Sequence, residues 1–164
     1  MINLFHEQGF VTGSEIARKL IEEQLQRGGS LLPWIHPTDF QQEVFSRRLA
    51  FWKSIPVGQL AFSDRAIPDQ LAFMRYRKAN PLDVIAEGCR SYRYFPTVFV
   101  TPPWKAIYRR DAVRGESWKQ ACELHELLLH EYREAGYQIY ILPLVSVDER
   151  CRLVLQCLEK QLKS

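Results

Sequence analysis

The stretch QLAFSDRAIPDQLAF, residues 59–73, decides the fold class of this chain. It begins with the short apolar run QLAF, continues through Asp64 and Arg65, and then opens a helix at Pro68 and Asp69. Proline suits the first turn of a helix, where a backbone N–H would have no partner. A buried strand that leads through an acidic turn into a helix is typical of proteins in which strands and helices alternate.

The same alternation extends to both ends of the chain. Strands separated by helices of roughly ten or more residues pair in parallel through right-handed crossovers, and apolar runs without alternation are buried on both faces. We therefore predict an α/β fold, with a mainly parallel sheet between two layers of helices in a single domain over residues 1–164. Further strands are expected in TVFV and QIYIL, and in GFVTG if it is extended; further helices are expected at Ser14–Arg27, from Thr38 to Pro56, from Pro81, at Ser117–Ala135 and after an N-cap at Ser146.

The composition is that of an ordinary water-soluble domain. Hydrophobic residues make up 46% and charged residues 25% of the 164 residues, and no apolar run approaches the roughly 18 residues of a membrane span. No secretory signal pattern opens the sequence, so we expect a cytoplasmic protein. The net charge of +3 is too small to favour nucleic-acid binding. None of the four cysteines forms a CxxC pair, which argues against a zinc site.

Asp64 and Arg65 are the first candidates for chemistry. Ligands of α/β proteins bind beyond the carboxyl ends of the strands, where these residues follow QLAF. The Asp64 carboxylate could hold Mg²⁺ beside a polyphosphate, and Arg65 could clamp a phosphate or carboxylate of the substrate. The alternative is purely structural: Asp64 and Asp69 cap the following helix, and Arg65 pairs with one of them.

A basic segment, WKAIYRRDAVRGESW at residues 104–118, is the second candidate. It contains Arg109, Arg110 and Arg114 and leads into the long helix. Arginines on a mobile cover can surround the charge that develops during phosphoryl transfer. The alternative is a solvated charge run at a helix boundary.

Two further places supply candidate binding residues. Glu15 and Arg18 are three residues apart, at a spacing that permits an ion pair on one helix face. They would also lie at the ligand edge if GFVTG is a strand. Trp34, in the loop LLPWIH, could cover a base or equally pack on the core.

Taken together, these segments resemble the bacterial predicted ATPases of the NadR-type AAA group. That group is a branch of the P-loop NTPases related to nicotinamide-riboside and nucleotide kinases. The resemblance extends from about residue 9 to the end of the chain. It rests on the order and spacing of SEIARKLIEEQLQRGG, LLPW with DFQQEVFSRRL, FSDRAIPDQLAF, VFVTPPWKAIYRRDAVRGES and LPLVSVDER.

The resemblance implies a P-loop, nucleotide-kinase-like fold that uses Mg²⁺ with ATP or GTP and an unknown small-molecule acceptor. It implies that Asp64 serves the metal and the phosphates, and that the segment 104–118 is a lid. Members usually have glycine after the DR pair, where this chain has Ala66. The other residues that match functional positions are Arg65, Asp69, the lid residues Arg109, Arg110 and Arg114, the pair Glu15 and Arg18, and the base-contacting loop with Pro143, Ser146 and Val147.

The chain departs from this family pattern at its start. The family opens with a strand, the motif GxxxxGK[ST] and a helix whose end resembles INLFHEQGF, and no GxxxxGK[ST] occurs in this sequence. We therefore expect the first strand and its phosphate-binding loop to be missing, and turnover to be impaired. Strand edges left exposed could pair with another copy, so the alternative function is a non-catalytic interaction or oligomerisation module.

Overall fold

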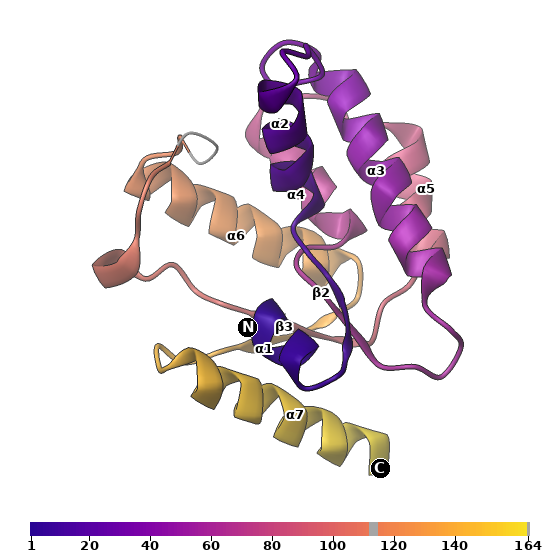
Figure 1. The fold of residues 1–164 in the computed structure, drawn as a ribbon, viewed down its shortest axis with the longest axis vertical. Helices are drawn as coiled ribbons and strands as arrows, with labels where there is room; N and C mark the ends of the chain where they lie inside the picture. Colours follow the sequence, from indigo (N-terminus) through magenta and orange to yellow (C-terminus); the bar gives the residue numbers. More distant parts are fainter. Residues whose placement is uncertain (112–114, 164) are drawn as a thin grey trace.

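A computed structural model describes residues 1–111 and 115–163 (Figure 1). The elements are α1 (Ile2–Glu7), β1 (Val11–Gly13), α2 (Ile16–Gln26), α3 (Pro37–Ser54), β2 (Ala61–Ser63), α4 (Ile67–Tyr76), α5 (Asp83–Ser91), β3 (Thr97–Val100), the 3-10 turn η1 (Lys105–Ile107), α6 (Trp118–Glu134), β4 (Gln138–Ile141) and α7 (Val147–Lys163). Every strand and helix expected from the sequence is present, within a few residues of the predicted bounds. Among the described residues, no helix is long and apolar enough to cross a membrane.

The strands form two separate parallel pairs. β1 pairs with β2, with Thr12 opposite Phe62, and β3 pairs with β4, with Phe99 opposite Tyr140. The predicted parallel pairing is therefore confirmed. The predicted single sheet is not formed by the described residues, because no backbone hydrogen bond joins β2 to β3. In the part of the chain that the structure describes, β2 and β3 each keep one edge without a partner strand.

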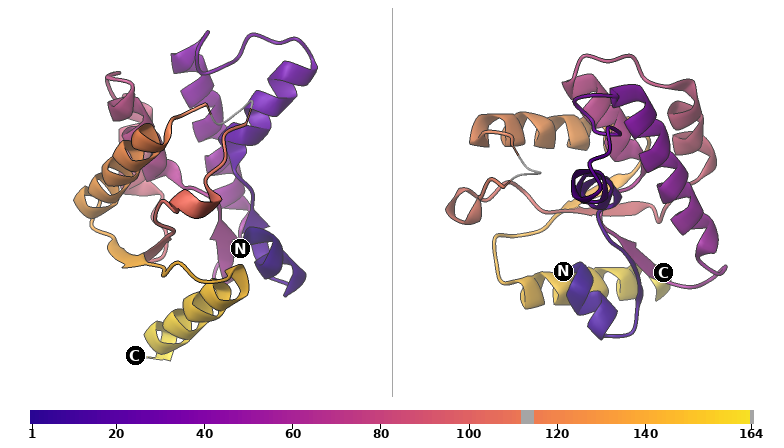
Figure 2. Two further views of the ribbon diagram at one scale, coloured as in Figure 1. Left: turned by 90° about the vertical axis from the view of Figure 1, so that its left-hand side faces the viewer. Right: turned by 45° about the horizontal axis from the view of Figure 1, so that its top comes forward.

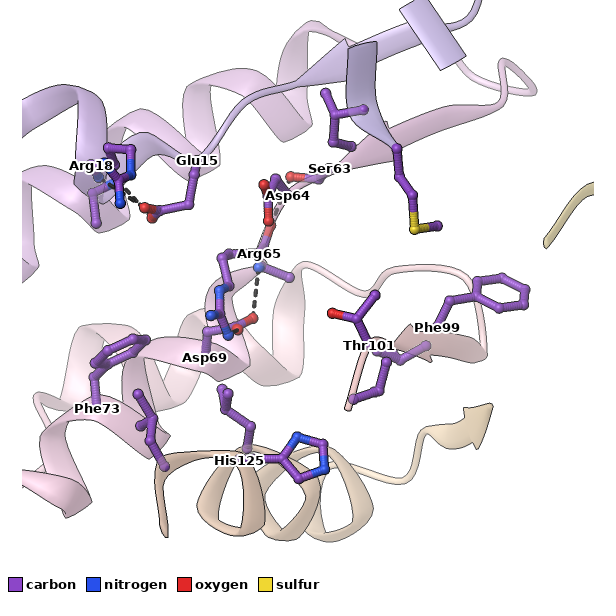
Figure 3. A pocket seen from close by; sticks show the side chains of 18 of the residues that line it. Glu15, Arg18, Ser63, Asp64, Arg65, Asp69, Phe73, Phe99, Thr101 and His125 are labelled. Atoms are coloured by element: carbon purple, nitrogen blue, oxygen red, sulfur yellow. Dashed lines mark hydrogen bonds and ion pairs between the residues drawn. The ribbon is translucent and has the colours of Figure 1, made fainter. Parts of the chain in front are cut away.

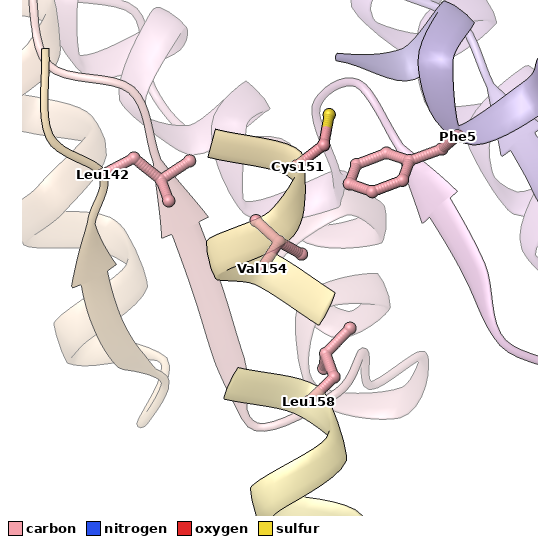
Figure 4. Packing of buried hydrophobic residues seen from close by; sticks show 5 residues of the cluster. All are labelled: Phe5, Leu142, Cys151, Val154 and Leu158. Atoms are coloured by element: carbon pink, nitrogen blue, oxygen red, sulfur yellow. The ribbon is translucent and has the colours of Figure 1, made fainter. Parts of the chain in front are cut away.

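Helices lie on both sides of the β3–β4 pair. Successive side chains of a strand point to opposite faces. Accordingly, Phe99 and Tyr140 pack on the cluster formed by α1 and α7, whereas Val98 and Ile139 pack near Tyr132 of α6. Figure 4 shows the first cluster, in which the α7 side chains lie between α1 and the end of β4. Its buried members are Phe5, Leu142, Cys151, Val154 and Leu158.

A second apolar region joins the helices α2 to α5, which gather at one end of the molecule in Figures 1 and 2. Leu20 of α2 packs with Phe40 and Val44 of α3. The next residue of α3, Phe45, packs with Ile67 of α4 and buried side chains of α5. These four helices therefore form one packed group, which is joined to β2 through the turn before α4. The group lies on one side of the carboxyl ends of the strands.

Local capping explains where the helices begin and end. Ser146 Oγ accepts a hydrogen bond from the backbone N–H of Glu149 at 3.2 Å, as predicted for the N-cap of α7. Ser117 caps α6 in the same way, and the Gln120 side-chain oxygen accepts a hydrogen bond from the Ser117 backbone N–H. Gly136 follows α6 with φ of 78°, which confirms the predicted C′ glycine.

Candidate functional site

A cleft of about 1510 Å³ separates the two strand pairs. Its walls include all four residues of β3, the residues of β2, and side chains from the helices on both sides. Figure 3 shows Asp64 and Arg65, which follow β2, and Thr101, which follows β3, around the same space. Single ligand sites usually have volumes of roughly 300–1,000 Å³, so this cleft has room for more than one small molecule.

Asp64 is placed at the cleft by its backbone. Its N–H donates to the carbonyl of Gly13 at 2.8 Å, which continues the β1–β2 ladder by one residue. The side chain is exposed, and its carboxylate has no hydrogen bond or ion pair with any described residue. The alternative prediction that Asp64 caps the following helix is therefore wrong. Both carboxylate oxygens remain available to a ligand.

The donor set fits Mg²⁺ held together with phosphates. No group of three or more His, Cys, Asp or Glu side chains in the described residues could hold a metal by itself. Mg²⁺ in nucleotide sites is commonly bound by one or two carboxylates, with phosphate oxygens and water completing the octahedron. A single free carboxylate at the end of a strand meets that requirement, and Asp64 supplies it.

Arg65 is held in a restrained conformation beside Asp64. Its φ of 75° lies in the left-handed region, which is uncommon for a residue with a Cβ. Its Nη1 donates to Asp69 Oδ1 at 3.1 Å, and its guanidinium lies over the ring of Phe73. Burial alone would lower the pKa of Arg65, but the charge and hydrogen bond of Asp69 raise it above its ordinary value, with help from Asp64 and Glu15. Arg65 therefore stays cationic at the cleft.

Asp69 is a buried anchor at the start of α4, with 2% of its surface exposed. One oxygen accepts the Ala66 backbone N–H at 2.8 Å and also the hydroxyl of Tyr132, while the other accepts from Arg65. The capping role and the pairing with Arg65 are thus confirmed for Asp69. Because its oxygens already have these partners, Asp69 positions Arg65, and direct contact with a substrate stays a prediction.

Glu15 and Arg18 both line the cleft but do not bond side chain to side chain. The Glu15 carboxylate caps α2 by accepting the backbone N–H groups of Ala17 and Arg18 at 3.2 and 3.1 Å. The Arg18 guanidinium instead reaches Asp111 at 3.1 Å and Glu22 at 3.6 Å. The predicted ion pair is therefore replaced by a contact between α2 and the lid-like segment 104–118.

Two of the three lid arginines, Arg109 and Arg110, belong to the described residues. Arg109 donates to the Tyr108 carbonyl at 3.1 Å and Arg110 donates to the Gly115 carbonyl at 2.7 Å. Both side chains are exposed, and neither is among the residues that line the cleft, although their neighbours Tyr108 and Gly115 are. Arg114 lies outside the described residues. The participation of the lid arginines stays a prediction.

Four more predicted residues divide between the cleft and other roles. Trp34, which is 53% exposed, and Val147 line the cleft. Pro143 and Ser146 do not, and the Ser146 hydroxyl caps α7. The predicted base-contacting loop thus reaches the cleft only at Val147.

The structure adds residues that the sequence interpretation missed, including His125, Arg48 and Arg150, which all line the cleft. Burial lowers the pKa of His125, opposed by Glu126 and reinforced by Arg65 and Arg133. Arg150 lies 6.0 Å from the ring of Trp104. For Arg48 the sequence carried a signal: it follows Phe40 and Val44 at a spacing of four residues, so an arginine occupies an apolar helix face.

Comparison with known proteins identifies the family of the chain. Residues 1–150 match a family model described as an AAA domain, and the chain belongs to that family. The family is consistent with a nucleotide-binding protein of the P-loop type. Searches among curated proteins and among solved structures give no match.

Proposed function

We propose that the cleft binds the polyphosphate of ATP or GTP together with Mg²⁺, and that the site supports γ-phosphoryl transfer to a small molecule or to water. The observation that carries this proposal is the free Asp64 carboxylate at the end of β2, beside the cationic Arg65, in a chain of the AAA family. The closer relation to NadR-type kinases is part of the proposal and rests on the sequence resemblance.

The residues divide the work by charge and position. The Asp64 carboxylate would be the protein ligand of Mg²⁺. The bound Mg²⁺ would offset part of the negative charge on the phosphate oxygens. Arg65, fixed by Asp69, would donate to phosphate oxygens without first having to be ordered. Arg109, Arg110 and Arg114 would approach from the lid as charge develops on the transferred group.

We expect turnover by this chain to be weak or absent. The sequence contains no GxxxxGK[ST], whose backbone amides, lysine and hydroxyl are the main polyphosphate contacts in P-loop proteins. Phosphoryl transfer depends almost entirely on positioning and charge stabilisation, so loss of these contacts affects catalysis more than it affects binding at Asp64. Nucleotide binding is therefore the appropriate first measurement.

The test is a calorimetric titration of the chain with MgATP and MgGTP, repeated on two variants. Asp64→Asn should abolish the Mg²⁺-dependent part of binding and lower thermal stability only slightly, because the carboxylate bonds no described residue and only its charge acts on Arg65. Arg110→Ala should weaken binding if the lid contributes. Saturable binding that is the same in all three proteins would contradict the assigned site, and absence of binding would reject nucleotide chemistry for this chain.

Matched controls separate these effects from a change of net charge. Asp83→Asn removes an exposed carboxylate at the first turn of α5, and Arg27→Ala removes an exposed cation after α2. Neither residue lines the cleft. Both variants should bind nucleotide as the unmodified chain does.

A second candidate function is a strand-pairing interaction module, and one observation favours it. In the described residues, β2 and β3 each have a single partner strand, so two free edges border the cleft. Unpaired edges are templates for another extended chain. As the alternative to nucleotide binding, we propose that a second copy of this chain supplies the extended segment that pairs with these edges.

Light scattering across a range of concentrations, combined with amide hydrogen exchange, tests this rival. Dimers whose Ala61–Ser63 and Thr97–Val100 amides exchange more slowly than in the monomer would support strand pairing. A monomer at all concentrations would reject it. Slower exchange confined to other segments of a dimer would also reject it, because the contact would lie elsewhere.

A further inference from the structure

The most buried arginine of the cleft has no hydrogen-bond or ion-pair partner among the described residues. Arg48 of α3 is only 4% exposed and lines the cleft. Its Nε and Nη1 are buried without a hydrogen-bond partner, and no described carboxylate forms an ion pair with it. Each of the two edges that a guanidinium uses for bidentate contacts includes one of these nitrogens. A buried, unpaired charge is among the most costly features that a protein can keep.

The surroundings of Arg48 leave an excess of positive charge. Its charge acts on the hydroxyl groups of both Tyr94 and Tyr132, which places it near the buried start of α4. Asp69 is the buried acid there, and its oxygens are bonded to Arg65, Tyr132 and the Ala66 N–H. Asp69 thus bonds Arg65 and does not bond Arg48.

Gln70 adds an unused acceptor to the lining of the same cleft. It is 1% exposed, and its Nε2 donates to the backbone carbonyl and the side-chain oxygen of Gln41, both at 2.8 Å. These contacts fix the orientation of the amide and leave Oε1 without a partner. Gln41 lies on the face of α3 that carries Arg48, seven residues earlier, and both line the cleft.

We propose that Arg48 is the centre of a buried oxyanion subsite, which binds a phosphate or carboxylate group of a second substrate, with Gln70 accepting a hydrogen bond from a hydroxyl of that molecule. The binding of an oxyanion does not rest on the proposed function. The assignment of this oxyanion to the phosphoryl acceptor does rest on the proposed function. Asp64, exposed at the end of β2, serves the metal-bound polyphosphate, whereas the enclosed Arg48 serves a small anion. The volume of the cleft leaves room for both.

The experiment measures the thermal stability of the full chain with increasing inorganic phosphate, and in parallel with acetate as the carboxylate probe. One or both anions should raise the midpoint temperature of thermal unfolding of the unmodified chain. Arg48→Met should weaken that response roughly 10- to 100-fold in apparent Kd, because charge-assisted hydrogen bonds are lost. Without anion, Arg48→Met should be as stable as the unmodified chain or more so, which a merely structural arginine would not allow.

Arg47→Met is the matched control on the same helix. Arg47 bonds Glu43 and Glu23, both at 2.7 Å, and does not line the cleft, so its removal should leave the anion response intact. If Arg48→Met fails to fold, Arg48→Lys is the second variant. It keeps the positive charge but cannot form the two parallel hydrogen bonds of a guanidinium, so it should still weaken the response to anion. An unchanged response in the folded Arg48 variant, or no response to either anion in the unmodified chain, overturns the subsite.

Addition of MgATP distinguishes the two sources of the oxyanion. Phosphate and nucleotide effects that add together support a separate second-substrate subsite. Competition between them overturns that assignment, because the anion would then be the nucleotide's own phosphate. An anion response that depends on Arg48, in a chain that does not bind nucleotide, would support the subsite and reject the proposed nucleotide function.

Discussion

Tyr132 donates its hydroxyl hydrogen to Asp69, and this bond ties the last turn of α6 to the first turn of α4 beneath the candidate site. Both side chains are buried, at 6% and 2% exposure. Burial, followed by the charge and hydrogen bond of Asp69, raises the pKa of Tyr132 well above its ordinary value, so the hydroxyl remains a donor. Asp69 in turn fixes Arg65, so packing between two helices sets the position of a cation at the cleft.

The first prediction concerns this bond. Tyr132→Phe keeps the ring but removes the donor, which leaves the buried Asp69 carboxylate with one partner fewer. We expect the free energy of unfolding to fall by about 1–3 kcal/mol. Urea denaturation measures it. Tyr140→Phe is the control, because that hydroxyl bonds no described residue, and it should change stability by less than about 0.5 kcal/mol. Equal losses in the two variants would contradict the role of the bond.

The second prediction concerns the close approach of α5 to α3. A Cβ built at Gly88 would overlap the ring of Phe45, at 2.7 Å from Cζ and closer still to Cε2. Alanine gains about 1 kcal/mol of helix propensity over glycine, whereas overpacking a core costs about 1–3 kcal/mol. Gly88→Ala should therefore destabilise the chain by about 1 kcal/mol in the same urea assay.

Shortening the opposing side chain tests the cause of that loss. The double variant Gly88→Ala with Phe45→Leu should lose less stability than the sum of the two single variants, because the overlap disappears. Gly115→Ala, where no described residue outside its chain neighbours lies within 4 Å of the added atom, is the control for a glycine replacement. Additive losses in the double variant would rule out the overlap as the cause.

Local patterns predicted the helices and strands well, because the residues that determine each element lie within a few positions of one another in the sequence. The run 59–73 indicated β2, the turn and α4, and Ser146 was correctly predicted to cap α7. Relationships distant in sequence were less accessible. Arg18 pairs with Asp111, 93 residues away, instead of Glu15, and the division of the strands into two sheets depends on spatial order.

The site residues follow the same rule. Asp64 and Arg65 could be placed from sequence because both directly follow a strand. The role of Arg48 becomes visible only in the folded chain, where α3, α4 and the segment with Tyr94, between α5 and β3, line the same cleft. The capping alternative was correct for Asp69 and wrong for Asp64, since both carboxylates precede or begin the same helix and only tertiary geometry selects one.

The third prediction concerns a partly buried ion pair between α4 and α6. Arg75 Nε lies 2.6 Å from Glu131 Oε1, and the Glu131 side chain is 8% exposed while that of Arg75 is 55% exposed. Arg75→Ala leaves a buried carboxylate unpaired, and because one partner faces solvent we expect a loss of only about 1–2 kcal/mol. Lys119→Ala breaks the exposed 3.9 Å pair with Glu123 on α6 and should cost less than about 0.5 kcal/mol. A comparable loss in both variants would contradict the dependence on burial.

The fourth prediction concerns the pH dependence that His125 adds to stability. Burial lowers the pKa of His125 from its ordinary value of 6.5. The unfolded chain therefore binds this proton more readily than the folded chain, and stability rises with pH wherever that holds. The contribution is complete above 6.5 and is lost as pH falls through 6.5 toward the lower pKa of the folded state. Chemical denaturation across about pH 7 to pH 5 should show a shallower decline for His125→Gln than for the unmodified chain. His130→Gln, at an exposed histidine on the same helix, is the control for the replacement itself. An identical slope in His125→Gln would show that the folded and unfolded states bind this proton equally.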